Sequence, residues 1–394
     1  MKKILCWLTL LCLPLATALN ALAEGGAPVI AGRTVDFYYG NPDTVLPASV
    51  YFIDGSDVPF LALSDWQAVI DGLAMCDTDI AQARAGDSFQ FNFSMRGNTG
   101  VLTREDGYTA EFDCDADTIH FPDYDAFLRL NHNSFLTDMV GIDESGPDEP
   151  VRYLRRSRII SYQRYGSEVT INAADYGVDF IARGGQCYVP MQTLGDLLLC
   201  NLYTSVFWNG EIAVFGSPDV FGDSDALTPL GEKYYSVEPR ARSAAMARFS
   251  YGELCLALDA MYGLKASHGI DRFDTLFGDT GMKADLAGTD VVKASAALHQ
   301  LFQMHLDDQH SAFILPSPLA GVHAADRFQT DVGYGLSDLN AYREGTRYRK
   351  ARSAVWPDGV PGYEEVGNTA FITLDNFKDK IGRASCRERV SSPV

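Results

Sequence analysis

The chain has few basic residues for its size. It carries 32 Lys and Arg against 52 Asp and Glu, a formal net charge of −20 at pH 7. A surface of that sign repels the phosphates of nucleic acids and the headgroups of anionic lipids. We therefore expect neither nucleic acid nor a membrane surface as a partner.

Cysteines are also few, and no two have the Cys-x-x-Cys spacing. Of the eight, Cys6 and Cys12 lie in the apolar N-terminal segment and Cys386 lies in an unusual C-terminal tail. The remaining number is odd, and the spacings are not those of a disulfide framework, although disulfides stay open for an exported chain. We interpret the others as small buried apolar side chains: Cys76, Cys114, Cys187, Cys200 and Cys255.

Several motifs that carry chemistry are missing. The sequence has no Gly-x-Ser-x-Gly elbow, no His-Glu-x-x-His and no phosphate-binding loop. Asp113, Asp115 and Asp117 resemble the start of a calcium loop, but Thr118 stands where that loop needs Gly and Tyr124 where it needs Glu. We expect no metal and no cofactor.

The first 23 residues are typical of a secretory signal peptide. Lys2 and Lys3 precede a short apolar run, and Ala21-Leu22-Ala23 supplies the small residues of a cleavage site before Glu24. No later stretch is long and apolar enough to span a bilayer. We expect an exported protein, located outside the cell, on its surface or in a periplasm, with no integral membrane segment after cleavage.

The last residues, 380–394, differ from the rest in composition. The acidic chain turns basic at Lys380, and the string from Lys380 to Val390 resembles the translation of a sequencing adaptor. We expect residues 380–394 to be an artefact, so that the genuine protein sequence is a fragment that stops near Asp379.

Residues 29–220 alternate short β-like runs with turn clusters, as in Phe89–Phe93, where every second residue is aromatic. A weak repeat aligns Val58–Asp65 with Val189–Asp196, each after a strand-turn-strand pattern and before an apolar helical stretch. These strings resemble copper amine oxidase N-terminal-like modules, a resemblance that implies no copper. They predict a duplicated, strand-rich α+β region.

Residues 238–320 have helical periodicity and predict a small helical bundle. Ser250-Tyr251-Gly252-Glu253 has the sequence of a capping box, which predicts a helix that starts there and stops near Gly263. A second helix is expected after Asp290. In residues 321–379, Asn368–Phe377 predicts a strand with no following strand to pair with. The fold class is therefore α+β.

Three strings in this second half resemble a known family. Tyr251–Leu264, Leu306–Phe313 and Asn368–Phe377 are similar, in order and spacing, to the bundle helix, the bundle end and the first core strand of carboxy-terminal processing (tail-specific) serine peptidases. The resemblance implies an α/β peptidase core, truncated here, that hydrolyses protein or peptide. It carries over no serine nucleophile, so we expect this fragment to be inactive.

The resemblance bears on one candidate catalytic residue. His310, followed by Ser311, stands where tricorn-like relatives have a general base, whereas processing peptidases use a downstream Lys; in the latter case His310 would be structural. Gln309 departs from the family's usual Gly before this His. That departure keeps open an exported, non-catalytic binding or scaffold protein on a peptidase-like fold. A cell-surface adhesion module built on the repeated units is a third reading.

Overall fold

The computed structural model describes residues 28–75, 90–128, 140–144, 152–156, 166, 168–199, 204–222, 226–306, 311 and 313–324, and short stretches between 351 and 372. Residues up to Val332 form one compact unit and those from Gly333 a second. The chain combines a seven-stranded and a five-stranded sheet with helices, which confirms the α+β class at that coarse level. The expected signal peptide, the tail after Asp379 and His310 lie outside the described residues.

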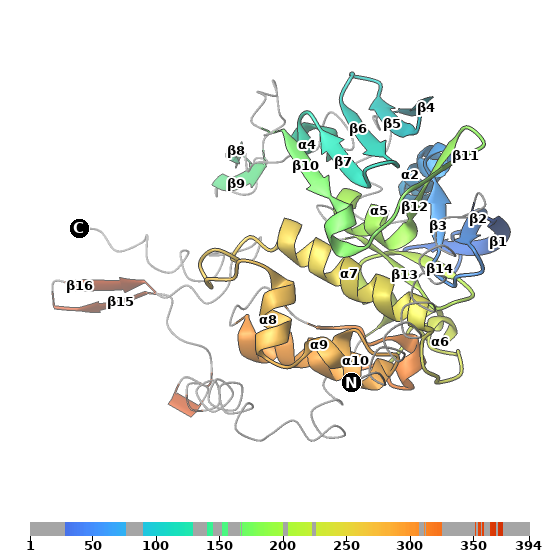
Figure 1. Cartoon of the computed structure of the whole chain (residues 1–394). Helices are drawn as coiled ribbons and strands as arrows, with labels where there is room; N and C mark the ends of the chain where they lie inside the picture. The colour runs from blue at the N-terminus through green and yellow to red at the C-terminus, as the bar shows by residue number, and fades with distance from the viewer. Residues whose placement is uncertain are drawn as a thin grey trace, which may run out of the picture. The chain divides into compact units, whose positions relative to one another are not determined.

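The larger sheet joins strands from both ends of the strand-rich region (Figure 1). Its order is β11-β12-β3-β2-β1-β14-β13, and every neighbouring pair is antiparallel except β1 with β14. The bounds are β1 Ile30–Tyr39, β2 Val45–Ile53, β3 Phe60–Ala62, β11 Ile181–Arg183, β12 Gln186–Pro190, β13 Ser205–Trp208 and β14 Ala213–Gly216.

The two repeated strings pair with each other in this sheet, next to its edge strand β11. Each contributes a strand followed by a helix: β3 leads through a 3-10 turn into α2 (Trp66–Met75), and β12 leads into α5 (Met191–Leu198). Phe60 pairs with Pro190, and the N–H of Met191 donates to the carbonyl oxygen of Pro59 at 2.9 Å. Since Pro59 aligns with Pro190 and Phe60 with Met191, the contact is reciprocal, as a local twofold axis requires.

The smaller sheet is antiparallel throughout, with order β10-β7-β6-β5-β4. Its core is shared with the larger sheet: Phe37, Leu61, Phe112 and Leu194 belong to one buried cluster. The remaining elements of the strand-rich part are β4 Phe91–Arg96, β5 Thr99–Arg104, β6 Thr109–Asp113, β7 Thr118–Phe121, α4 Tyr124–Leu128, β8 Val140–Glu144, β9 Arg152–Arg156 and β10 Val169–Asn172; β8 pairs with β9.

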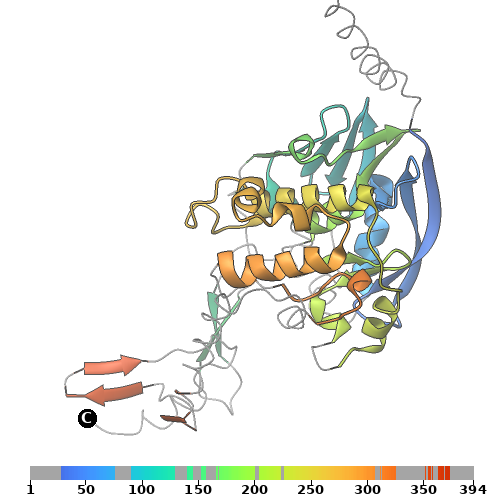
Figure 2. The ribbon, with the colours of Figure 1, turned by 60° about the horizontal axis from the view of Figure 1, so that its bottom comes forward.

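Helices dominate residues 229–306, and Figures 1 and 2 both show α7 running alongside the shorter helices that follow it. They bury their own cluster, which includes Phe273, Phe277, Leu301 and Leu306. The bounds are α6 Pro229–Tyr234, α7 Ala244–Met261, α8 Phe273–Asp279, α9 Lys283–Leu286 and α10 Val291–Gln300, followed by a π-helical turn over Leu301–His305.

The predicted capping box is wrong. Helix α7 begins at Ala244, where the Ser243 hydroxyl accepts from the Met246 N–H at 2.9 Å, so Ser250 lies inside the helix. The apolar residues before Ser250 let the helix extend about two turns further than the box implied. The second expected helix is confirmed: the Asp290 carboxylate caps α10.

In the second unit, strand β16 (Thr369–Ile372) lies inside the predicted strand Asn368–Phe377. It pairs in antiparallel register with β15 (Tyr363–Val366). The expected strand therefore has a partner on one edge, supplied by the chain that precedes it.

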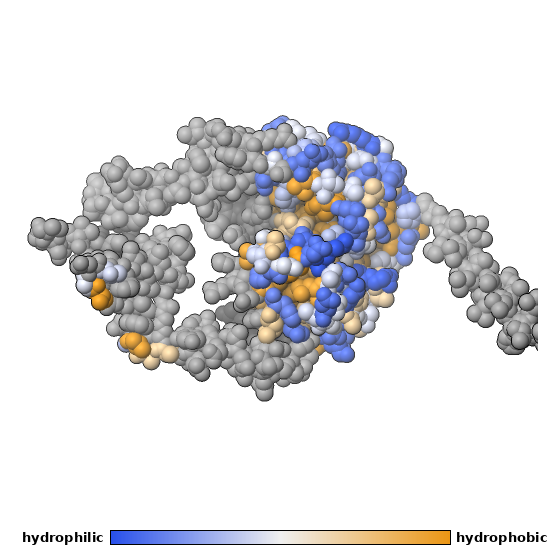
Figure 3. All heavy atoms as spheres, turned by 60° about the vertical axis from the view of Figure 1, so that its left-hand side comes forward, coloured by the Kyte–Doolittle hydropathy of each residue, from blue (hydrophilic) through white to orange (hydrophobic). Residues whose placement is uncertain are grey.

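The surface is mixed in character. Figure 3 shows hydrophilic side chains around smaller hydrophobic areas on the described part of one face. Within the described ranges, no helix has the length and apolar character that crossing a membrane requires.

Candidate functional site

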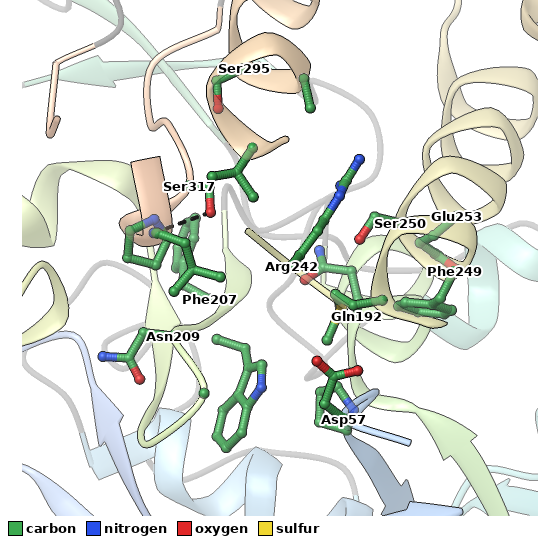
Figure 4. A pocket seen from close by; sticks show the side chains of 18 of the residues that line it. Asp57, Gln192, Phe207, Asn209, Arg242, Phe249, Ser250, Glu253, Ser295 and Ser317 are labelled. Atoms are coloured by element: carbon green, nitrogen blue, oxygen red, sulfur yellow. Dashed lines mark hydrogen bonds between the residues drawn. The ribbon is translucent and has the colours of Figure 1, made fainter. Parts of the chain in front are cut away.

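A cavity of about 700 Å³ lies between the larger sheet and the helices that follow it. The lining comes from β13, α5, α7, α10 and the segment 313–319. This volume is in the range of small-molecule sites. Figure 4 shows Arg242, Gln192, Ser250, Glu253 and Asp57 around the space.

Arg242 is the charged group at the centre of this view (Figure 4). It precedes α7, and its Nε donates to the carbonyl oxygen of Gly288 at 2.9 Å while Nη2 donates to that of Leu286. Burial lowers the pKa of Arg242. Among the described residues no carboxylate pairs with it, so a partly buried positive charge is held only by neutral carbonyls.

Glu253 lies beside the cavity on α7 and is 3% exposed. Its Oε2 accepts from the Thr193 hydroxyl at 2.6 Å, but Oε1 has no hydrogen-bond partner among the described residues. Burial, and then repulsion by Asp196, raise the pKa of Glu253 to about 8. The carboxyl is therefore mostly neutral at pH 7 and does not compensate the charge of Arg242.

Asp196 comes from α5, the helix whose Thr193 hydroxyl donates to Glu253. Burial raises its pKa to about 6, although the Gln192 side chain donates to it at 2.7 Å and Ser205 at 3.4 Å. Two carboxyls with raised pKa values at one cavity are an arrangement more common in functional sites than elsewhere.

Aromatic side chains from the larger sheet line part of the cavity. The guanidinium carbon of Arg33 lies 4.9 Å from the ring centre of Phe52 and 5.3 Å from that of Trp208. Phe207 and Phe249 add further apolar wall. The site therefore combines apolar surface with a few polar groups, the usual composition of a ligand pocket.

The residues that the sequence singled out lie partly in this region. Leu306, at the start of the peptidase-like string, is fully buried in the helical core, and Phe313, at its end, lines the cavity. His310 itself lies outside the described residues.

The three aspartates of the calcium-like string have structural partners. Asp113 accepts from the backbone N–H groups of the turn that follows, Asp115 from the Asn98 side chain, and Asp117 from the backbone N–H of Phe180 at 2.7 Å. Each carboxylate stabilises a turn or a loop.

Sequence reasoning misses the cavity residues. The sequence pattern assigns Glu253 to a helix cap and marks Asp196 only as part of a repeated string. A carboxylate amid the apolar run of α7, with Cys255 and Leu256 after it, is the one signal that could have marked Glu253 as buried. Arg242 gives no signal, because its environment is made by residues far away in the sequence.

No protein-family model, curated protein or solved structure matches this chain.

Proposed function

We propose that the chain is part of an exported serine-type peptidase of the tail-specific protease family that acts on protein or peptide. One observation carries the proposal. The string that resembles the end of the family's bundle starts in the core of a helical bundle, at Leu306, and ends at the wall of a cavity, at Phe313. The two ends of this string therefore lie at the helical core and at the candidate site, which is the position that the family resemblance implies.

The proposal includes a duplicated N-terminal region. The reciprocal pairing of β3 with β12, each leading into a helix, is what two copies of one unit related by a local twofold axis would give. In this proposal residues 29–220 hold the copies, 238–320 the bundle, and 321–379 the start of the core.

The test has two stages. Long-read sequencing of the locus should show a continuation after Asp379 that differs from residues 380–394 and supplies a serine nucleophile. The 394-residue chain should not hydrolyse casein, whereas the completed protein should, and should lose activity when that serine becomes Ala.

His310→Ala in the completed protein then distinguishes a general base from a structural residue. A loss of about a hundredfold or more in kcat/KM supports a general base. A change below about threefold assigns His310 to structure. Casein hydrolysis by the 394-residue chain, or recovery of the same tail from native DNA, would contradict the proposal.

A second candidate function, ligand binding without catalysis, is favoured by the cavity. Arg242 offers a guanidinium with no carboxylate partner among the described residues, Glu253 is mostly neutral at pH 7, and several lining side chains are aromatic. A small amphipathic molecule with an anionic group fits these three features, since the charge-assisted hydrogen bonds of Arg are strongest to carboxylate-like oxygens.

Two fluorescent probes test this candidate. Anilinonaphthalene sulfonate, an anion, should bind the chain, and Arg242→Met should weaken that binding about tenfold. Neutral phenylnaphthylamine should bind both proteins alike, which shows that the cavity persists. Arg248→Met removes an exposed charge from the same helix and is the control. Equal affinity of wild type and Arg242→Met for the anion would rule this candidate out.

A further inference from the structure

Two cysteines that are far apart in the sequence have their sulfur atoms 3.3 Å apart. Cys114 follows β6 of the smaller sheet, and Cys187 lies on β12 of the larger one. The two sheets are neighbours in Figure 1. The pair thus lies at the junction of the two sheets. The sequence left disulfides open without indicating a pair, and Cys114 is partly exposed where a buried side chain was expected.

The sequence makes room for this contact at Gly100 on β5. A Cβ atom there would come within 2.5 Å of the Cys187 Cβ and 2.9 Å of its sulfur. Glycine at this position therefore lets β12 approach the smaller sheet closely enough for the two sulfurs to touch.

We propose that Cys114 and Cys187 form a disulfide that fastens the two sheets together in the oxidised protein. A disulfide bond is about 2.05 Å long, so the sulfurs must approach by roughly one ångström, which small rotations about the Cα–Cβ bonds provide. The oxidant is a low-molecular-weight or protein disulfide of the kind found where exported proteins fold.

The exposure of the two side chains determines which thiol reacts first. Cys114 is partly exposed and Cys187 is completely buried, so the Cys114 thiolate attacks the oxidant first and releases one thiol. Cys187 then loses its proton and displaces the second thiol from the mixed disulfide. Two electrons pass from the cysteine sulfurs to the oxidant, which leaves as two thiols carrying both protons.

The electrostatics of the reduced pair agree with Cys114 as the first nucleophile. The pKa of Cys187 is raised, first by its hydrogen bond with Cys114 and then by burial, so the buried thiol stays protonated until the mixed disulfide forms. Cys255 is also buried but belongs to the helical core, which makes it a matched cysteine without this partner.

Peptide mapping tests the bond directly. The purified full chain is oxidised with glutathione disulfide, free thiols are alkylated, and the protein is digested without reductant. Mass spectrometry should find the segments of Cys114 and Cys187 linked, and the link should vanish with reductant. This result does not depend on the proposed export, because the oxidant is supplied.

Thermal unfolding tests the consequence. The bond closes a separation of 73 residues, so reductant should lower the Tm of the oxidised wild type by roughly 5–15 °C. Cys114→Ser and Cys187→Ala should show no such shift, and Cys255→Ala should keep it. If Cys187→Ala does not fold, the comparison of Cys114→Ser with wild type, at the more exposed of the two positions, still tests the disulfide. Separate alkylation of both cysteines after oxidation, or links to Cys76 or Cys200 instead, would overturn the proposal.

Discussion

The carboxyl of Glu253 is the most perturbed group at the cavity whose titration falls in an accessible pH range. It is buried on α7, hydrogen-bonded on one oxygen by Thr193 and repelled by Asp196. Removal from water disfavours the charged form, which is why its pKa rises to about 8. Such a group links the stability of the fold to pH.

The sign of this linkage follows from the raised pKa. Glu253 contributes its full stability below the ordinary Glu value of 4.5, and that contribution is lost as pH rises from there through about 8. Glu253→Gln keeps an oxygen for Thr193 but cannot ionise. It should match wild type near pH 4 and exceed its unfolding free energy by roughly 2–4 kcal/mol near pH 8.5.

Urea unfolding at the two pH values measures the difference. Glu232→Gln removes the same charge from an exposed position and should follow wild type throughout. If Glu253→Gln gained no stability over wild type between the two pH values, the burial of an ionisable carboxyl here would be wrong.

Helix α7 touches two cores. Leu256 belongs to the core of the sheets and Cys255, its neighbour in the chain, to the core of the bundle. Gly252 permits the closest approach, because a Cβ there would lie 2.0 Å from the backbone oxygen of Tyr176. The close packing of α7 against the strand-rich part therefore requires that residue 252 has no side chain.

Gly252→Ala should destabilise the protein by about 1–3 kcal/mol, since backbone must move to admit the methyl group. Gly278→Ala in α8 is the matched control, because a Cβ there meets nothing within 4 Å. That change should stabilise by up to about 1 kcal/mol through helix propensity. Denaturation midpoints distinguish the two, and a neutral or stabilising Gly252→Ala would contradict the packing described.

At the scale of the whole molecule, the cavity exists because one compact unit holds both the strand-rich part and the bundle. Arg242 helps to assemble it: its side chain holds Leu286 and Gly288, and its backbone N–H donates to Thr289 at 3.0 Å. The loop between α9 and α10 is thereby fixed next to the start of α7. An acidic chain of net charge −20 thus keeps a partly buried guanidinium at the cavity.

The sequence by itself determined the coarse α+β class, the helix capped by Asp290 and the strand within Asn368–Phe377, because hydrophobic period and local capping act between near neighbours. It did not determine where α7 begins, since apolar residues before Ser250 outweighed a local capping pattern. Only the tertiary structure decided that Glu253 is buried opposite Asp196, that Arg242 has no acidic partner among the described residues, and that Cys114 meets Cys187. The last contact joins positions 73 residues apart, and it arises from the packing of two sheets, which no periodicity within either segment encodes.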